Sequence, residues 1–291
     1  MEYIKKHFLE KGWVVLDLLD PNPVWQTRTF LELEVERFFG KKIPLEEYHK
    51  YIQTDEEHTA LQIRLTKAFR DQALGPTILA RQFSFFCDFL GPDLLVQANP
   101  YLRITRPHKE QDNIGYHRDT FYGGSPYELS VFVPFVELPS ESSLKVLSGS
   151  HIHSEENYPT IQIENLDAAV RKGTAKHQLG FLYAPKVMDP SIEKEMEPVP
   201  LKVGQALLFS LATVHGSLVN SGTVSRWSSD MRVMHALAPV DLSARPDYYK
   251  PLSYSVVTEC AKKYFYKNGK ETRDNVELEL CHTASGKPTA N

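Results

Sequence analysis

Two residues with metal-binding side chains stand two positions apart in the segment Gly115-Tyr-His-Arg-Asp-Thr120. In an extended chain, residues two apart point to the same face, so His117 and Asp119 can converge on one ion. A neutral imidazole and a carboxylate, joined by a second imidazole, form a facial triad that leaves neighbouring coordination positions open. That arrangement suits non-haem iron(II) and oxygen chemistry. The His-x-Asp pattern arises easily by chance in a chain with 11 histidines, so it needs support from elsewhere.

A suitable third ligand lies far downstream, in Gly204-Gln-Ala-Leu-Leu-Phe-Ser-Leu-Ala-Thr-Val-His215-Gly-Ser. This stretch predicts a turn, an apolar strand and a histidine where the strand ends. Further on, Arg226 opens the run Arg-Trp-Ser, and Arg226 and Ser228 share a face if that run is a strand. A guanidinium grips a carboxylate through two hydrogen bonds, and a hydroxyl can add another. A dicarboxylate that binds the metal through one end needs such a partner at the other.

A competing metal site is conceivable in His151-Ile-His153-Ser-Glu155. That segment follows a Ser-Gly-Ser turn and has no strand pattern, so a polar loop is the favoured interpretation. Another charged loop, containing His108, Lys109, Glu110 and Asp112, precedes His117. It is either a solvated turn or a substrate-binding rim.

Three further residues are candidates for substrate contacts: Arg103, Tyr122 and Arg232. Arg232 has the same strand parity as Asp230, and beside it could bind a polar substrate or equally form a buried structural ion pair. Arg103 shares a face with Tyr101 and Thr105, while Leu102 and Ile104 face the core. Tyr122 is close enough to Asp119 in the chain to line the pocket, although an aromatic residue there is more often packing.

With these residues in place, the sequence resembles the phytanoyl-CoA dioxygenase-like family of iron(II)/2-oxoglutarate-dependent oxygenases. The resemblance spans roughly residues 1 to 238. The motifs that carry it are Phe8-Leu-Glu-Lys-Gly-Trp-Val-Val-Leu16, His117-Arg-Asp119, Leu144-Lys-Val-Leu-Ser-Gly-Ser-His151, Gly204-Gln-Ala-Leu-Leu-Phe, His215-Gly-Ser and Arg226.

The resemblance implies a mainly β fold with flanking α-helices, a double-stranded β-helix that is also called a cupin-like jelly roll. It implies that His117, Asp119 and His215 bind iron(II), and that Arg226, helped by Ser228, pairs with the distal carboxylate of 2-oxoglutarate. Molecular oxygen is the other reactant. In related halogenases a small residue replaces the carboxylate ligand. Asp119 is present, which favours hydroxylation or another oxidation, such as desaturation, over halogenation.

The sequence does not identify the substrate, because family members act on acyl thioesters, amino acids, sugars and antibiotic intermediates. Charged residues near the expected pocket mouth favour a polar small molecule. The C-terminal Pro-Thr-Ala-Asn is not a peroxisomal address. Two other functions stay open: a cupin-like metal enzyme without a keto-acid co-substrate, such as an isomerase, and a non-catalytic binding protein on the same fold. Arg226 discriminates against the first, because that enzyme needs no carboxylate clamp.

The helices and strands that must position these residues are predicted in different parts of the chain. Apolar spacing predicts helices first, and then short strands with turn signals between them. The predicted helices are Ile4–Leu9, Pro21–Phe39, His58–Phe69, Thr77–Leu90 and Tyr254–Tyr266. The predicted strands are Trp13–Leu19, Leu94–Ala98, Tyr101–Thr105, Leu129–Val136, Leu144–Leu147, Ala206–Leu211 and Trp227–Ala236.

We therefore expect a single catalytic domain over residues 1–291. It comprises a helix-rich part (1–92), a jelly-roll core (93–240) and a C-terminal extension (241–291) with a frayed end (285–291). Residues 158–198 are weakly periodic and read as an insertion or a lid over the pocket.

Composition limits the possible partners. The formal net charge is −4 and no basic block is present, which argues against nucleic acid. No apolar run approaches the roughly 20 residues that span a bilayer. Cys87, Cys260 and Cys281 are scattered, which indicates free thiols in a reducing cytoplasm. The oligomeric state cannot be inferred from the sequence.

Overall fold

The computed structural model describes residues 1–161, 186–240 and 247–266. The chain divides into two compact units, Met1–Ser253 and Tyr254–Asn291. The second unit contains helix α8 (Val256–Tyr266), close to the bounds predicted from the sequence. The predicted frayed end and Cys281 lie outside the described residues. The organisation into one domain over 1–291 stays a prediction.

The larger sheet belongs to the first unit, and within the described residues it has seven strands, all paired antiparallel. Their order is β1-β9-β4-β11-β2-β12, and β3 also pairs with β11. The strands are β1 (Trp13–Asp17), β2 (Leu94–Gln97), β3 (Tyr101–Thr105), β4 (Leu129–Pro134), β9 (Gln205–Ser210), β11 (Arg226–His235) and β12 (Tyr249–Ser253). The two edge strands β1 and β12 come from outside the stretch 93–240.

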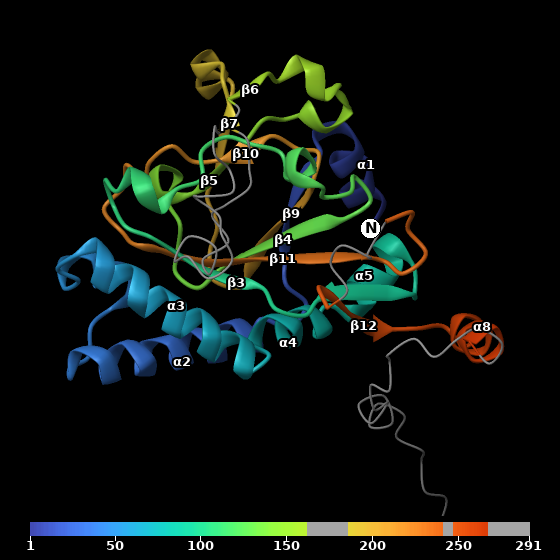
Figure 1. Ribbon diagram of the computed structural model, residues 1–291, viewed down its shortest axis with the longest axis horizontal. Coiled ribbons are helices and arrows are strands. Elements are labelled where there is room, and N and C mark those ends of the chain that lie inside the picture. Colours follow the sequence, from blue (N-terminus) through green and yellow to red (C-terminus); the bar gives the residue numbers. More distant parts are fainter. Residues whose placement is uncertain (162–185, 241–246, 267–291) are drawn as a thin grey trace, which may run out of the picture. The chain divides into compact units, whose positions relative to one another are not determined.

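Shorter strands form a second antiparallel sheet with the order β10-β5-β8. These strands are β5 (Leu144–Val146), β8 (Glu197–Val199) and β10 (His215–Gly216). The smaller sheet lies on the opposite side of the larger sheet from helices α2 to α4 (Figure 1). A mainly antiparallel fold of this kind, with flanking helices, is the jelly roll that the sequence predicted.

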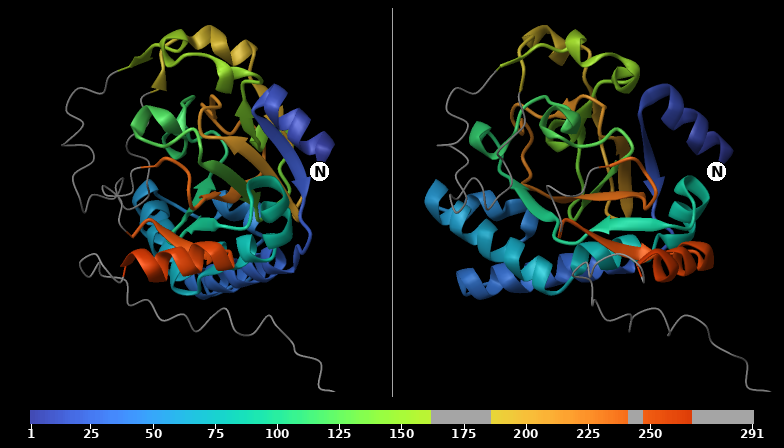
Figure 2. Two further views of the ribbon diagram at one scale, coloured as in Figure 1. Left: turned by 90° about the vertical axis from the view of Figure 1, so that its right-hand side faces the viewer. Right: turned by 45° about the vertical axis from the view of Figure 1, so that its right-hand side comes forward.

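Helices α2 (Asn22–Phe39), α3 (Asp55–Asp71) and α4 (Leu74–Ala80) cover one face of the larger sheet. Helix α1 (Glu2–Lys11) contacts β1, and α5 (Phe83–Leu90) contacts β2. In the views of Figures 1 and 2, α2 and α3 run beneath the strands, and α3 contacts β3. None of the described helices is long and apolar enough to cross a bilayer.

Alternation along the strands separates the core from the pocket. On β11, Trp227, Met231 and Val233 are fully buried in the main hydrophobic core. Residues of the other parity on β11, Arg226 to Arg232, line a pocket on the opposite face. Successive side chains of a strand point to opposite faces, so β11 contributes to the core on one face and to the pocket on the other. On β3, Leu102 and Ile104 are likewise buried in the core, as predicted, whereas Arg103 and Thr105 line the pocket.

One predicted helix is two helices in the structure. The apolar run Thr77–Leu90 is interrupted between α4 and α5, at Arg81 and Gln82. The side chain of Gln82 accepts a hydrogen bond from the backbone N–H of Leu19 and donates to the carbonyl of Asp20. These long-range hydrogen bonds stabilise the interruption between α4 and α5. The spacing of apolar residues in the sequence does not indicate this interruption.

The predicted lid (158–198) is only partly within the described residues, which exclude 162–185. Its described ends pair as β6 (Thr160–Ile161) and β7 (Lys186–Val187). Its last residues form β8, which pairs with β5. The C-terminal end of this segment is therefore a strand of the smaller sheet rather than part of an insertion.

Candidate metal centre and pocket

The two histidines of the candidate site are neighbours on adjacent backbones. The N–H of His117 donates to the carbonyl oxygen of His215 at 2.9 Å, and the reverse hydrogen bond is also 2.9 Å. This antiparallel bridge brings the segments far apart in sequence into direct register. Both side chains are buried, and their ring centroids lie 4.4 Å apart.

Backbone carbonyls orient both imidazoles. His117 Nδ1 lies 2.9 Å from the carbonyl oxygen of Gly115, and His215 Nδ1 lies 2.9 Å from that of Thr213. A carbonyl oxygen only accepts hydrogen bonds, so Nδ1 carries the proton in each ring. Each Nε2 therefore keeps its lone pair for a metal, and the ring is held in place by the second hydrogen bond.

The glycine after His215 permits the close approach of the two segments. Gly216 has φ +143°, and a Cβ built there would lie 2.0 Å from the carbonyl oxygen of Gly115. No larger residue fits without separating the backbones. The His-Gly pair of the sequence is thus a packing requirement of the bridge.

The segment Leu144–His151 supports the same region. Ser150 Oγ accepts from the N–H of Val214 at 2.8 Å and donates to the carbonyl of Leu147 at 2.7 Å. Arg118, between the two candidate ligands, is 1% exposed and donates to the carbonyls of Ser150 and His153. This motif therefore holds the backbone next to His215, which is a structural role.

Asp119 completes the group. Its Oδ1 lies 3.6 Å from His117 Nε2 and 3.9 Å from His215 Nε2. Asp119 does not continue an extended segment as predicted, because it begins a short 3-10 helix (Asp119–Tyr122). His117 and Asp119 nevertheless point toward the same position, because the intervening residue Arg118 has an extended backbone. Among the described residues, His117, Asp119 and His215 are the group of three whose ligand atoms all lie within 4.8 Å of one another.

The electrostatics favour the protonation states that a metal needs. Burial works to raise the pKa of Asp119, but Arg232, His215 and His117 outweigh it, so that the pKa of this carboxyl lies well below its usual range. Burial and the neighbouring His117 lower the pKa of His215 to about 4. At neutral pH the site therefore offers a carboxylate and a neutral His215 imidazole, a donor set that suits iron(II).

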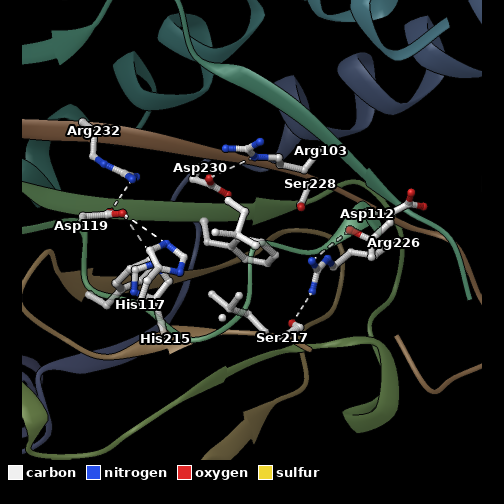
Figure 3. A pocket seen from close by; sticks show the side chains of 16 residues that line it. Arg103, Asp112, His117, Asp119, His215, Ser217, Arg226, Ser228, Asp230 and Arg232 are labelled. Carbon is white, nitrogen blue, oxygen red and sulfur yellow. Dashed lines mark hydrogen bonds and ion pairs between the residues drawn. The ribbon is translucent and has the colours of Figure 1, made fainter. Parts of the chain in front are cut away.

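The other end of the pocket is built around Arg226. Its two terminal nitrogens donate at 3.0 Å each, to Ser217 Oγ and to Thr105 Oγ1 (Figure 3). Within the part of the chain that the structure describes, Nε of Arg226 and Oγ of Ser228 are buried and have no hydrogen-bond partner. Burial lowers the pKa of Arg226 to about 10, so the guanidinium stays charged at neutral pH.

Among the described residues, the hydrogen bonds of this guanidinium go to hydroxyls, and the charges of Asp230 and Asp112 offset its burial only in part. A buried cation of this kind is costly unless an anion joins it. Arg226 and Ser228 therefore fit a ligand carboxylate. Ser217, which sequence reasoning did not single out, follows directly after His215-Gly. The His-Gly-Ser motif was the signal that could have found it.

Two arginine–aspartate pairs line the pocket, one at the metal end and one nearer to Arg226. Arg232 donates to Asp119 Oδ2 at 2.5 Å, and Arg103 Nε lies 3.6 Å from Asp230 Oδ2 (Figure 3). Of the two alternatives that the sequence left open for Arg232, a substrate contact or a buried ion pair, the structure shows a buried ion pair, but with Asp119 rather than with Asp230. The structure does not describe the side chain of Tyr122.

The rival histidine cluster does not converge. His151 Nε2 contacts the carbonyl of Leu9 at 3.0 Å, whereas His153 Nδ1 contacts the hydroxyl of Tyr158 at 2.8 Å. The charged loop before His117 has two parts. Lys109 and Glu110 are exposed, but Asp112 is buried, lines the pocket and forms an ion pair with Arg106 at 2.8 Å.

No family model matches the sequence, and no curated protein matches it. Similar solved structures include a "non-heme monooxygenase", ThoJ, in its apo form. That match has 15% sequence identity and a TM-score of 0.52 and covers 91% of this chain and 94% of that chain. The ThoJ–nickel complex matches with 15% identity, a TM-score of 0.51 and the same coverage. EvdO2 from Micromonospora carbonacea var. aurantiaca matches with 17% identity and a TM-score of 0.50, covering 83% of this chain and 94% of that chain. At these identities the likeness shows a shared fold, the jelly roll of non-haem oxygenases.

Proposed function

We propose that the protein is an iron(II)/2-oxoglutarate-dependent oxygenase that hydroxylates a polar small molecule with release of succinate and carbon dioxide. We further propose that it belongs near the phytanoyl-CoA dioxygenase-like family, which its motifs resemble. His117, Asp119 and His215 hold the ferrous ion, and Arg226 with Ser228 binds the distal carboxylate of 2-oxoglutarate. When bound, iron and keto acid would together activate molecular oxygen, which is the oxidant and supplies one oxygen atom to the substrate and one to succinate.

One observation carries this proposal. A buried His-Asp-His group lines the same pocket as a buried guanidinium whose Nε has no hydrogen-bond partner among the described residues. A dicarboxylate with a keto group has chemistry for both ends, since one end can chelate the metal and the other can accept from Arg226. A cupin-like isomerase would explain the metal group but not Arg226. A binding protein would need neither a complete donor set nor a vacant hydrogen-bond donor beside it.

The residues between the two ends support a polar substrate. The ion pair Arg103–Asp230 lines the pocket, and its side chains are 13% and 26% exposed. The pair Arg106–Asp112, of which Asp112 also lines the pocket, is only 4% and 3% exposed. A pair that stays accessible can hydrogen-bond a polar ligand, so Arg103 supports a polar substrate. Tyr122 remains a candidate from its position in the sequence.

The test is formation of succinate from 2-oxoglutarate in the presence of iron(II) and oxygen, with candidate polar compounds added singly. We expect slow succinate formation without substrate and faster formation with the right compound. His215→Ala should abolish both iron binding and succinate formation. Unchanged iron binding by His215→Ala, or no oxygen-dependent succinate from the wild-type protein, would contradict the proposal.

A further inference from the structure

The two oxygens of the Asp119 carboxylate have different surroundings. Oδ1 faces the two imidazoles, at 3.6 Å from His117 Nε2 and 3.9 Å from His215 Nε2. Oδ2 accepts a hydrogen bond from a terminal nitrogen of Arg232 at 2.5 Å. The carboxylate is 2% exposed, so water does not compete for this interaction. One oxygen is therefore directed at the metal position and the other at a cation.

Arg232 is itself fixed by the sheet. Its other terminal nitrogen donates to Ser130 Oγ at 2.6 Å, and Ser130 is its direct cross-strand neighbour in the pairing of β4 with β11. Ser130 is fully buried. A planar guanidinium can reach two acceptors on different elements at a set angle, which a flexible ammonium cannot do. Arg232 thus joins the loop that carries Asp119 to the central strands of the larger sheet.

We propose that Arg232 is a positioning residue that presents Asp119 to the metal through Oδ1 alone. This inference rests on the proposed iron site. A carboxylate can bind a metal through one oxygen or through both. An iron centre that must also accept a keto-acid chelate and oxygen needs its remaining positions open. By engaging Oδ2, Arg232 prevents Asp119 from occupying one of those positions.

Loss of Arg232 should therefore change the affinity for the metal and the affinity for the keto acid by different amounts. Without Arg232, Asp119 keeps Oδ1 and gains the use of Oδ2, so the metal should still bind. The keto acid, however, must then compete with the second oxygen of Asp119. A residue that merely supported the fold would lower the affinities for metal and keto acid together.

Arg232→Met and Arg232→Lys are the test variants, with cobalt(II) as a spectroscopic probe that does not turn over. Cobalt affinity and the change of its visible absorption on titration with 2-oxoglutarate are measured for each. Loss of an outer partner usually costs about ten- to a hundredfold in metal affinity or activity. For Arg232→Met we expect a loss of about that size in keto-acid affinity, but cobalt affinity within about threefold of wild type, because Asp119 then offers both of its oxygens to the metal. Arg232→Lys, which keeps the charge but not the fork, should lose keto-acid affinity in the same direction and is the variant to use if Arg232→Met does not fold.

Arg28→Met is the matched control. Arg28 is also a largely buried, ion-paired arginine, held by Glu32 and Glu46 on the helical side of the sheet. It should lower the melting temperature and leave both titrations unchanged. Wild-type keto-acid affinity in either Arg232 variant, or an equal loss of both affinities, would overturn the positioning role. Failure of the wild-type protein to bind cobalt would instead reject the proposed metal site.

Discussion

The two ends of the pocket are built on opposite principles. At the metal end, the negative charge of Asp119 already has a cation beside it in Arg232, and each imidazole has a carbonyl partner. At the Arg226 end, the charge faces hydroxyls, and a buried Nε and the nearby Ser228 Oγ lack hydrogen-bond partners among the described residues. The first end is organised in advance for a cation. The second is incomplete without an anion. The difference teaches that two equally buried ends of one pocket can differ in whether their polar atoms already have hydrogen-bond partners.

The largest effect should come from removing a histidine at the metal end. His117→Ala should reduce affinity for iron(II) or cobalt(II) by about a hundredfold or more, because loss of a ligand exceeds the usual cost of losing an outer partner. Keto-acid binding should disappear with the metal. Isothermal titration provides the measurement, with His153→Ala, from the rival cluster, as the control. Retention of tight metal binding by His117→Ala would break the comparison at its first end.

Arg226→Met tests the opposite end. A buried, hydrogen-bonded charge pair loses about 3 kcal/mol when one partner is truncated, which is roughly a hundredfold in affinity. We expect that loss in 2-oxoglutarate binding to the cobalt-loaded protein, while cobalt affinity itself is unchanged. If cobalt affinity fell as much as keto-acid affinity, the two ends would not be separate sites.

Ser228→Ala should have a smaller effect in the same direction. Loss of one hydroxyl hydrogen bond costs about 1 kcal/mol, or roughly fivefold in 2-oxoglutarate affinity. The neighbouring Ser229 is a matched control, because its hydroxyl is on the other face of β11 and donates to the carbonyl of Tyr101 at 2.9 Å. Ser229→Ala should affect stability only. Equal keto-acid affinities for the two variants would remove Ser228 from the site.

A separate effect, on stability rather than on ligand affinity, concerns pH behind the Arg226 end. Burial lowers the pKa of His58 to about 4, and its Nε2 lies 3.7 Å from Oδ1 of the pocket residue Asp112. Above pH about 6.5, the ordinary histidine pKa, this imidazole is neutral in both the folded and the unfolded protein. As the pH falls from there to about 4, the unfolded protein takes up a proton that the folded protein does not, so stability is lost by up to about 1.4 kcal/mol per pH unit.

His58→Gln should therefore flatten the dependence of the urea midpoint on pH between 7 and about 4. Tyr48→Phe is the control, because it removes the hydroxyl that bonds to His58 Nδ1 without removing the titrating ring. That control should lower stability at every pH and keep the slope. An unaltered slope in His58→Gln would show that the acid sensitivity lies elsewhere, for instance at the metal end.

Much of the fold could be predicted from local patterns. The strand from Tyr101 to Thr105 has the predicted bounds, and alternation along β11 correctly separated the face of Arg226 from the face of Trp227. Both inferences need only the two-residue period of a strand. The break at Gln82 could not be predicted, because its hydrogen bonds reach residues more than sixty positions away.

The same division holds for the candidate site. The sequence by itself singled out the candidate residues for metal and carboxylate binding, His117, Asp119, His215 and Arg226, because they stand in motifs whose spacing sets their faces. Only the tertiary structure decided that Arg232 contacts Asp119 rather than Asp230, and that Arg226 Nε has no hydrogen-bond partner within the described part of the chain. A strand fixes the direction of a side chain through its own local geometry, whereas the partner that meets it depends on how segments 113 residues apart pack together.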